Sequence, residues 1–583
     1  MSEWDEAAAL LDGPYLAAYG EHYGDGLPGF AHQGGALCRV KVSGSEETFE
    51  PLANFDALIV EEQRLDDGQS EDAQYLVEGI HNFRELPRLA VSAKQFNSLA
   101  WLSRWPSSVS LMPTYGAERR LCYAMRAGGV EARKHAHIHI ATGWRPGGYY
   151  VHGGGAIGRE NAMVALEGSL ARYELPEAST DGAKASARLL RAYPMGVSAP
   201  LLGLMYLAPL VDFLQGAKCA PGVTLWLCGS TQSGKSTAAG LFMSHYGSGL
   251  CSAKNAPASF HDSPAALRKK AYLLKDMPLW VDDYHPVASR QAREKMDALA
   301  QTMIRGWSNR TDAARANSDL SLRAPMPPRG VGLCTGEDLP GVTESGLARL
   351  YVVRMGRGDK IPLDTLREMQ QAGESGLLAA GMAGYIDWLR GQSGEEMKQR
   401  FQSLHRSVVD LVPDDGGDLA ENVAFLALGL NMALDYFAAC GVEDTEKLKA
   451  LGLSAMLAGA ADQSKSLHEE KPWALFLETL QALLDTKTVL VQDGGGPLMG
   501  PDFVGWRRDG WYYLLPIPVY SAVQQALGKQ GRSFPLQRGQ LQRVLVEAGV
   551  ATPGSDGAPT AVKKLGGKTY RVLCIPEGVM NAC

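Results

Sequence analysis

The sequence predicts a multidomain α/β protein. Its 583 residues exceed what one compact domain usually holds, so several folded units are expected. Continuous apolar runs, typical of buried parallel strands, alternate with segments in which apolar residues recur every three or four positions. A glycine-rich loop follows one of these runs in the middle of the chain. A core built on a parallel sheet is therefore expected between two other regions.

The order of these patterns predicts four parts. Short apolar segments separated by turns predict an N-terminal α+β domain over residues 1–188. Strand-like runs separated by helical segments predict an α/β core over residues 189–363. Helical periodicity predicts a lid and bundle over residues 364–492, and a strand, two helices and a hairpin predict a winged helix-turn-helix over residues 493–583.

Composition restricts the compartment and the partners. The hydrophobic share of 45% and charged share of 21% are those of an ordinary globular protein. A net charge of -7 does not mark the whole surface for nucleic acid, so any DNA contact must be local. The nine cysteines form no CxxC pair, which favours reduced thiols and a cytoplasmic protein.

Neither export nor membrane insertion is expected. The segment Met1–Glu6 is acidic and lacks the basic start and apolar core of a signal peptide. The longest apolar stretch, from Leu201 to Leu214, contains Pro209 and falls short of the roughly 20 residues that a membrane span needs. A buried helix is the preferred interpretation of this stretch.

A phosphate-binding loop is predicted between the strand-like run at 223–228 and an apolar helix. The loop fits GxxxxGK[ST] and, with the residue after it, comprises Gly229, Ser230, Thr231, Gln232, Ser233, Gly234, Lys235, Ser236 and Thr237. Its backbone N–H groups and the helix N-terminus present partial positive charge to phosphates. Lys235 would reach the β- and γ-phosphates, and the Ser236 hydroxyl would coordinate Mg²⁺. ATP and Mg²⁺ are the predicted cofactors.

Polar residues at two later strand ends complete the predicted catalytic site. Asp282 follows the run Leu279-Trp280-Val281 and is expected to hold Mg²⁺ together with Ser236. Asp283 comes next and is expected to orient the attacking water. Thr335 ends a third strand-like run and is a candidate sensor of hydrolysis, with a polar cap on the strand as the alternative.

Arginines supply two further hypotheses. Arg349 is the candidate arginine finger that enters a neighbouring subunit's site, and Arg354, Arg329 and Arg310 compete for this role, with an ordinary surface arginine as the default for each. A polar stretch containing Arg305, Arg310, Arg315 and Arg323 would suit either a DNA-gripping hairpin or a solvated loop.

Two other polar patterns could form binding sites. Basic residues gather on the predicted winged tail, which favours DNA binding over protein docking: Lys529, Arg532, Arg538, Arg543, Lys563, Lys564, Lys568 and Arg571. His135, His137 and His139 alternate on one face of a predicted strand, a spacing that could serve a metal. Because no acidic or cysteine partner is near them in sequence, a half-buried strand with a polar face is preferred.

The combination of motifs resembles the ATPases of mobile genetic elements that include the Cch-type self-loading helicases. The likeness rests on Thr142-Gly143-Trp144-Arg145 with Gly153 to Ile157, the phosphate-binding loop, Val281 to Pro286, and Arg329 to Pro340. It extends from about residue 55 to 576. It implies an AAA+ core related to replicative helicases, a ring oligomer, and ATP-driven movement on DNA during replication of such an element.

This chain departs from many AAA+ proteins at two positions. Thr335 stands where they place asparagine, and Asp283 stands where they place glutamate. The leading hypothesis is a DNA helicase or translocase, hexameric, with replication proteins as further partners. The alternatives are a DNA-stimulated ATPase that remodels or loads other proteins, and a nucleotide-regulated DNA-binding switch.

Overall fold

The computed structural model describes residues 27–580 except for 34–35, 83, 131–132, 286–288, 313–323, 341–343, 413–417, 470–471, 495, 497–499, 530–533 and 535. The chain forms two compact units. The first contains most of residues 1–457, and the second contains residues 458–583 with the short segments 343–348 and 412–415. The N-terminal sheet, the parallel-sheet core and most of the helices predicted as lid belong to the first unit. The division into four parts stays a prediction.

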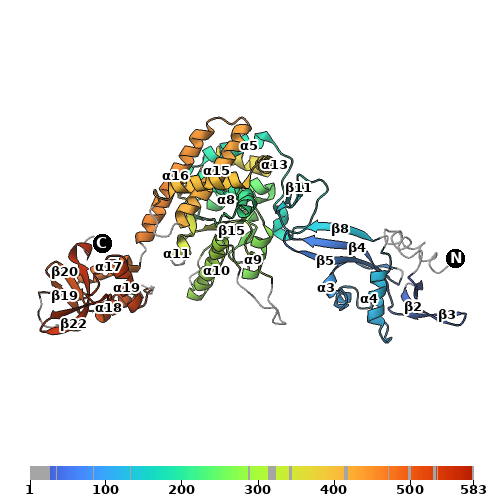
Figure 1. The fold of residues 1–583 in the computed structure, drawn as a ribbon, viewed down its shortest axis with the longest axis horizontal. Helices are drawn as coiled ribbons and strands as arrows, with labels where there is room; N and C mark the ends of the chain where they lie inside the picture. The colour runs from blue at the N-terminus through green and yellow to red at the C-terminus, as the bar shows by residue number, and fades with distance from the viewer. Residues whose placement is uncertain are drawn as a thin grey trace. The chain divides into compact units, whose positions relative to one another are not determined.

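The N-terminal part of the first unit has the predicted α+β arrangement (Figure 1). A long hairpin of β4 (Asp56–Asp66) and β5 (Glu71–His81) is extended by β8 (Lys134–His139), which pairs with β4 in parallel. Apolar residues of α4 (Ala117–Ala127) pack into the core beneath. The smaller elements are β1 (Phe30–Gln33), β2 (Ala36–Ser43), β3 (Glu46–Pro51), β6 (Arg84–Glu85), β7 (Leu89–Ser92), α3 (Ala93–Phe96) and β12 (Met163–Val164).

A small antiparallel sheet follows this domain in the chain. It consists of β9 (Gly143–Arg145), β10 (Tyr149–His152) and β11 (Gly155–Ile157), with β10 in the middle. Thr142, just before β9, donates hydrogen bonds through its backbone N–H and its hydroxyl to carbonyls at the end of α9 (Pro264–Leu273) and after it. These contacts connect the N-terminal sheet to the parallel-sheet core.

The core is a parallel five-stranded sheet in the order β14-β15-β16-β13-β17. The strands are β13 (Thr224–Cys228), β14 (Ala258–Ser259), β15 (Pro278–Tyr284), β16 (Val331–Gly336) and β17 (Leu350–Arg354). Every residue of β13 and β16 is buried, as expected for central strands covered on both faces. The three strands predicted from apolar runs are confirmed as β13, β15 and β16, and α8 (Lys235–Met243) and α10 (Arg290–Asn309) are among the crossover helices.

A helical layer packs with the core in the first unit: α5 (Thr180–Ala192), α6 (Met195–Leu207), α7 (Val211–Gly216), α12 (Leu363–Glu374), α13 (Leu377–Leu389), α14 (Gly394–Val408) and α15 (Asp418–Ala439). Helices α6 and α15 touch at glycines, since a Cβ on Gly429 would lie 2.1 Å from the Gly203 carbonyl oxygen. Among the described residues, Met195–Gly216 and Asp418–Ala439 are long and apolar enough to cross a membrane, but 89% and 78% of their apolar windows are buried inside the protein.

The second unit is a small α/β fold. Its sheet has the order β18-β19-β20-β22-β21, and its helices share one apolar core with that sheet. The elements are α17 (Pro472–Asp485), β18 (Leu490–Asp493), β19 (Phe503–Arg508), β20 (Trp511–Leu514), α18 (Pro516–Lys529), α19 (Arg538–Glu547), β21 (Ala561–Leu565), β22 (Lys568–Pro576) and α20 (Glu577–Met580). The predicted strand, two helices and hairpin are all present.

Candidate nucleotide site

All the predicted site residues except Arg349 lie at the carboxyl end of the strands of the core sheet. In the parallel pairing of β13 with β16, Leu227 lies opposite Thr335, and on the other side of β16 the residue Val281 lies opposite Cys334. The carboxyl ends of these three strands therefore lie side by side. The phosphate-binding loop follows β13, Asp282 lies near the end of β15, and Thr335 lies near the end of β16. Ligands in open α/β sheets bind at such edges.

The glycines of the phosphate-binding loop are required by its geometry. A Cβ on Gly229 would lie 2.2 Å from the Met355 carbonyl oxygen, so the loop can pass beneath this backbone only as glycine. Gly234 has a φ of 92° and caps α8, whose first residue is Lys235. The loop thus turns directly into a helix N-terminus, where backbone N–H groups are available to phosphates.

A chain of hydrogen bonds joins the loop to both strand ends. The Ser236 hydroxyl donates to Asp282 Oδ1 at 3.1 Å, and the Thr335 hydroxyl donates to the same oxygen. Trp280 Nε1 in turn donates to Thr335 Oγ1 at 3.3 Å. The two predicted Mg²⁺ ligands, Ser236 and Asp282, are therefore adjacent. Hydroxyl and carboxylate oxygens suit Mg²⁺, which commonly binds proteins through a few such ligands.

Thr335 is fully buried and contacts the carboxylate of Asp282, the predicted Mg²⁺ ligand. Its position supports a role in orienting Asp282, which a strand-end polar cap would not have. We expect Thr335→Val to lower kcat for ATP hydrolysis by about 10–100-fold, because an unsupported ligand carboxylate loses its orientation. Thr335→Ser, which keeps the hydroxyl, should restore most of this rate. Steady-state ATPase measurements test this, and equal losses in both variants would contradict it.

Asp283 has an unusual backbone conformation. Its φ is 65°, and the pairing of β15 with β16 shifts register between Val281 and Tyr284. Such an irregularity redirects a side chain that would otherwise alternate across the strand. The Asp283 carboxylate is 63% exposed and lies 3.4 Å from His261 Nε2. It does not share the hydrogen bonds of Asp282.

Glu337 is a site residue to which the sequence reasoning assigned no role. It follows β16 by one residue, and its carboxylate accepts a hydrogen bond from the Thr231 hydroxyl of the phosphate-binding loop. His285 Nδ1 lies 2.9 Å from its other oxygen. The hydrogen bond from Thr231 and the charges of His285 and Lys235 lower the pKa of Glu337. Its position directly after the strand that contains Thr335 could have indicated a role in the site.

The arginine candidates occupy different environments. Arg349 precedes β17 at the end opposite the loop, 3.7 Å from Asp418, whereas Arg354 ends β17 beside Cys228. Arg329 is buried, with its guanidinium 3.8 Å from the centre of the Tyr272 ring. Arg310 donates to the Pro221 carbonyl oxygen at 3.1 Å, and burial lowers its pKa to about 10. Arg329 and Arg310 are thus part of the internal packing.

Of the remaining arginines in the arginine-rich stretch, the structure describes only Arg305. Arg305 is exposed on α10. Arg315 and Arg323 lie outside the described residues. The DNA-gripping hairpin proposed for this stretch stays a prediction.

The strand order, the loop-to-helix junction and the acid at the end of β15, which is separated from β13 by β16, are the features of a P-loop nucleotide-binding fold. This chain has, more specifically, the fold of a solved structure described as "SCCmec type IV Cch - active helicase". The two align over 95% of this chain and 99% of the other, with a TM-score of 0.56 and 12% sequence identity. The likeness predicted from the motifs is therefore confirmed at the level of the fold.

A second solved structure, described as the "NrS-1 C terminal region", aligns over 90% of this chain and 97% of its own, at 11% identity. Its TM-score of 0.30 is too low to establish a shared fold. No protein-family model matches the sequence. No curated protein matches it either.

Proposed function

We propose that this protein is an ATP- and Mg²⁺-dependent DNA helicase or translocase that acts in the replication of a mobile genetic element. The observation that carries the proposal is the convergence of Lys235, Ser236, Asp282 and Thr335 at one edge of a parallel sheet, within a fold shared with a protein described as an active helicase. Hydrolysis of ATP at this site would supply the free energy for movement along DNA.

The residues of this site have separate parts in hydrolysis. Lys235 and the loop N–H groups bind and orient the phosphates, while Ser236 and Asp282 would hold Mg²⁺. Bound there, Mg²⁺ would offset the charge on the β- and γ-phosphate oxygens. Asp283 and Glu337 are two carboxylates available to orient the attacking water. Glu337 is favoured by its contact with Thr231 in the loop.

Assembly into a ring, as a hexamer, is part of the same proposal. Arg349 lies at the end of β17 opposite its own phosphate-binding loop, so as an arginine finger it would act on another subunit's nucleotide. Arg354 lies at the same edge as its own loop. A finger acting between subunits would couple hydrolysis to the position of the neighbour.

We propose that the second unit is a winged helix that binds DNA, with α18 and α19 as its helices and β21–β22 as the wing. Lys563 and Lys564 are exposed on β21 and Arg543 is exposed on α19. Replacing both Lys563 and Lys564 with glutamate should weaken duplex binding and reduce the slope of log K against log salt by about 2, roughly one unit for each lost phosphate contact.

Fluorescence anisotropy across a salt series measures this effect. Lys487→Glu is the control, because it reverses one lysine charge elsewhere in the second unit, half of the charge change in the double variant. A loss of affinity in the control that is half as large or larger, in free-energy terms, would indicate a general charge effect and contradict a DNA-binding wing.

Unwinding of a forked, fluorescently labelled duplex with ATP and Mg²⁺ tests the proposed activity itself. A helicase separates the strands and hydrolyses ATP faster when DNA is present. DNA-stimulated hydrolysis without separation would favour a protein remodeller or loader. Slow hydrolysis that DNA leaves unchanged would favour a nucleotide-regulated switch.

A further inference from the structure

A second cluster of polar side chains lies in the N-terminal sheet, away from the nucleotide site. Its centre is Asp66, the last residue of β4. In the sheet register Asp66 lies opposite His139, the last residue of β8, and opposite Glu71, the first residue of β5. His137 stands two residues before His139 and therefore on the same face. Four potential metal ligands thus meet at the end of three neighbouring strands.

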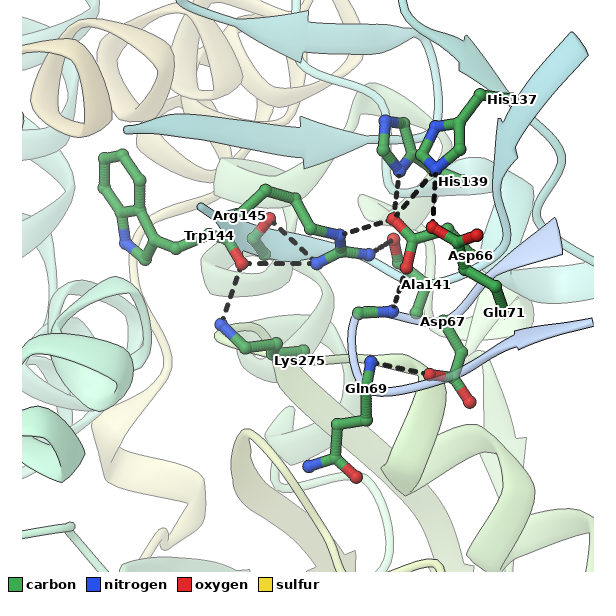
Figure 2. Close-up of polar contacts among 12 residues, drawn as sticks. Asp66, Asp67, Gln69, Glu71, His137, His139, Ala141, Trp144, Arg145 and Lys275 are labelled. Atoms are coloured by element: carbon green, nitrogen blue, oxygen red, sulfur yellow. Dashed lines mark hydrogen bonds and ion pairs between the residues drawn. The ribbon is translucent and has the colours of Figure 1, made fainter. Parts of the chain in front are cut away.

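The donor atoms are close together and directed at one another. His139 Nδ1 lies 2.8 Å and His137 Nε2 lies 3.9 Å from Asp66 Oδ2. The potential ligand atoms of these three residues all lie within 4.8 Å of one another. His137 Nε2 is also 3.5 Å from Glu71 Oε1. Figure 2 shows both imidazoles directed at the carboxylates of Asp66 and Glu71.

We propose that Asp66, His137 and His139, with Glu71 as the fourth ligand, form a structural site for a divalent transition-metal ion of the Zn²⁺ type. Zn²⁺ binds nitrogen and oxygen at about 2.0–2.1 Å in a tetrahedron, so its ligand atoms lie roughly 3.3–3.4 Å apart. The separations of 2.8, 3.5 and 3.9 Å bracket that value. The widest separation, up to 4.8 Å, would have to close by about 1.4 Å, mainly by movement of the partly exposed His137. Two imidazoles favour Zn²⁺ over Mg²⁺ or Ca²⁺.

The surrounding residues orient the two buried ligands. With Nδ1 bound to the ion, the proton of His139 would be on Nε2, which lies 3.5 Å from Tyr149 Oη and could donate to it. Arg145 Nε lies 3.3 Å from Asp66 Oδ2. The other guanidinium nitrogens of Arg145 donate to the carbonyls of residues 141–144, so this side chain is fixed in place.

The charges in the cluster are compatible with a bound cation. Asp66 Oδ1 accepts a hydrogen bond from the Gly68 amide at 2.6 Å, which leaves Oδ2 facing the imidazoles. Arg145 adds a positive charge beside the ion. Glu71 supplies a second carboxylate that offsets it, and its side chain is 48% exposed and can turn toward the site.

The position of the site suggests what the ion does. Asp67, the neighbour of Asp66, accepts a hydrogen bond from the Tyr272 hydroxyl at 2.9 Å, and Tyr272 belongs to α9 of the parallel-sheet core. Arg145 belongs to β9, which follows the segment that contacts α9. An ion that joins β4, β5 and β8 would stiffen the part of the N-terminal sheet that contacts the core.

Zn²⁺ binding by the full-length protein tests the proposal. The protein is treated with a chelator, dialysed, and titrated with Zn²⁺ in competition with a chromophoric chelator, without nucleotide and with excess Mg²⁺. We expect one Zn²⁺ per chain and a higher melting temperature in its presence. Co²⁺ should give the visible absorption of a tetrahedral site.

Variants of the partly exposed ligands identify the site without disturbing the buried network. His137→Ala should weaken Zn²⁺ binding by at least about 100-fold, since loss of an indirect partner alone costs 10–100-fold. His135→Ala, on the same face of β8, should bind like the native protein. Native-like circular dichroism of both variants without metal establishes that they are folded.

Two results would overturn the proposal. The first is that the native protein binds Zn²⁺ no more tightly than His137→Ala. The second is that His135→Ala loses as much Zn²⁺ affinity as His137→Ala. Unchanged affinity in Glu71→Gln would overturn the assignment of the fourth ligand. ATP hydrolysis plays no part in these readouts, so the result is independent of the proposed helicase activity.

Discussion

Replacing Lys235 with alanine is expected to lower the rate of ATP hydrolysis by on the order of 10²–10³-fold, and with it to abolish strand separation. Lys235 is the first residue of α8, directly after the loop that would surround the phosphates. Its ammonium group would stabilise charge on the β- and γ-phosphates in the transition state. Steady-state ATPase and forked-duplex assays on the same preparations measure both losses.

The matched control is Lys184→Ala. Lys184 is an exposed lysine on α5 whose ammonium pairs with Asp181 three residues earlier, so the same charge is removed from the same unit. It should retain native activity. Because the Lys235 side chain is at the loop and not in the apolar core, both variants should keep the native melting temperature. If a folded Lys235→Ala protein still separates strands, then ATP hydrolysis at this loop does not drive strand separation, and the assignment is contradicted.

The second large effect is expected for Asp282→Asn. Asparagine keeps the shape of the side chain and can still accept hydrogen bonds from Ser236 and Thr335, but it removes the negative charge. A divalent cation loses a charged ligand, so kcat should fall by roughly 10²–10³-fold and more Mg²⁺ should be needed for half-maximal activity. A Mg²⁺ titration of ATPase activity at saturating ATP measures both changes.

Asp283→Asn tests whether the Mg²⁺ requirement depends on Asp282 alone. The two acids are adjacent in sequence, but only Asp282 shares hydrogen bonds with Ser236 and Thr335, while Asp283 faces His261. Asp283→Asn should therefore leave the Mg²⁺ requirement unchanged. An Asp282→Asn protein with native Mg²⁺ dependence, or an Asp283→Asn protein with a strongly raised requirement, would reverse the proposed assignment.

Much of the candidate nucleotide site was predictable because its signals are local. A run of apolar residues, two glycines and a lysine at a helix start lie close together in the chain, so a motif can describe them. Asp282 and Thr335 were found for a related reason, since each ends a buried strand. That their side chains share one hydrogen-bond network follows only from the order of strands in the sheet.

The contact of Glu337 with the phosphate-binding loop could not be predicted from local sequence. Its partner Thr231 is 106 residues earlier in the chain, and their contact depends on β16 lying next to β13 in the sheet. The arginines illustrate the same limit, because only packing distinguishes buried Arg329 from the strand-end residues Arg349 and Arg354.

The histidines of β8 show the difference most directly. Sequence spacing placed His137 and His139 on one face of a strand, and the structure confirms that strand. The absence of an acidic residue nearby favoured a polar strand face over a metal site. Asp66 is 73 residues before His139, and pairing of β4 with β8 brings them to hydrogen-bond distance.

The sequence by itself determined three of the five core strands, several helices and the phosphate-binding loop of this protein, because periodicity, glycine positions and short motifs express preferences of neighbouring residues. Tertiary structure alone decided which strand ends share an edge, which charged side chains are buried, and which distant carboxylates meet the histidines. These depend on strand order and register, which are set by packing of the whole sheet and its helices rather than by any local segment.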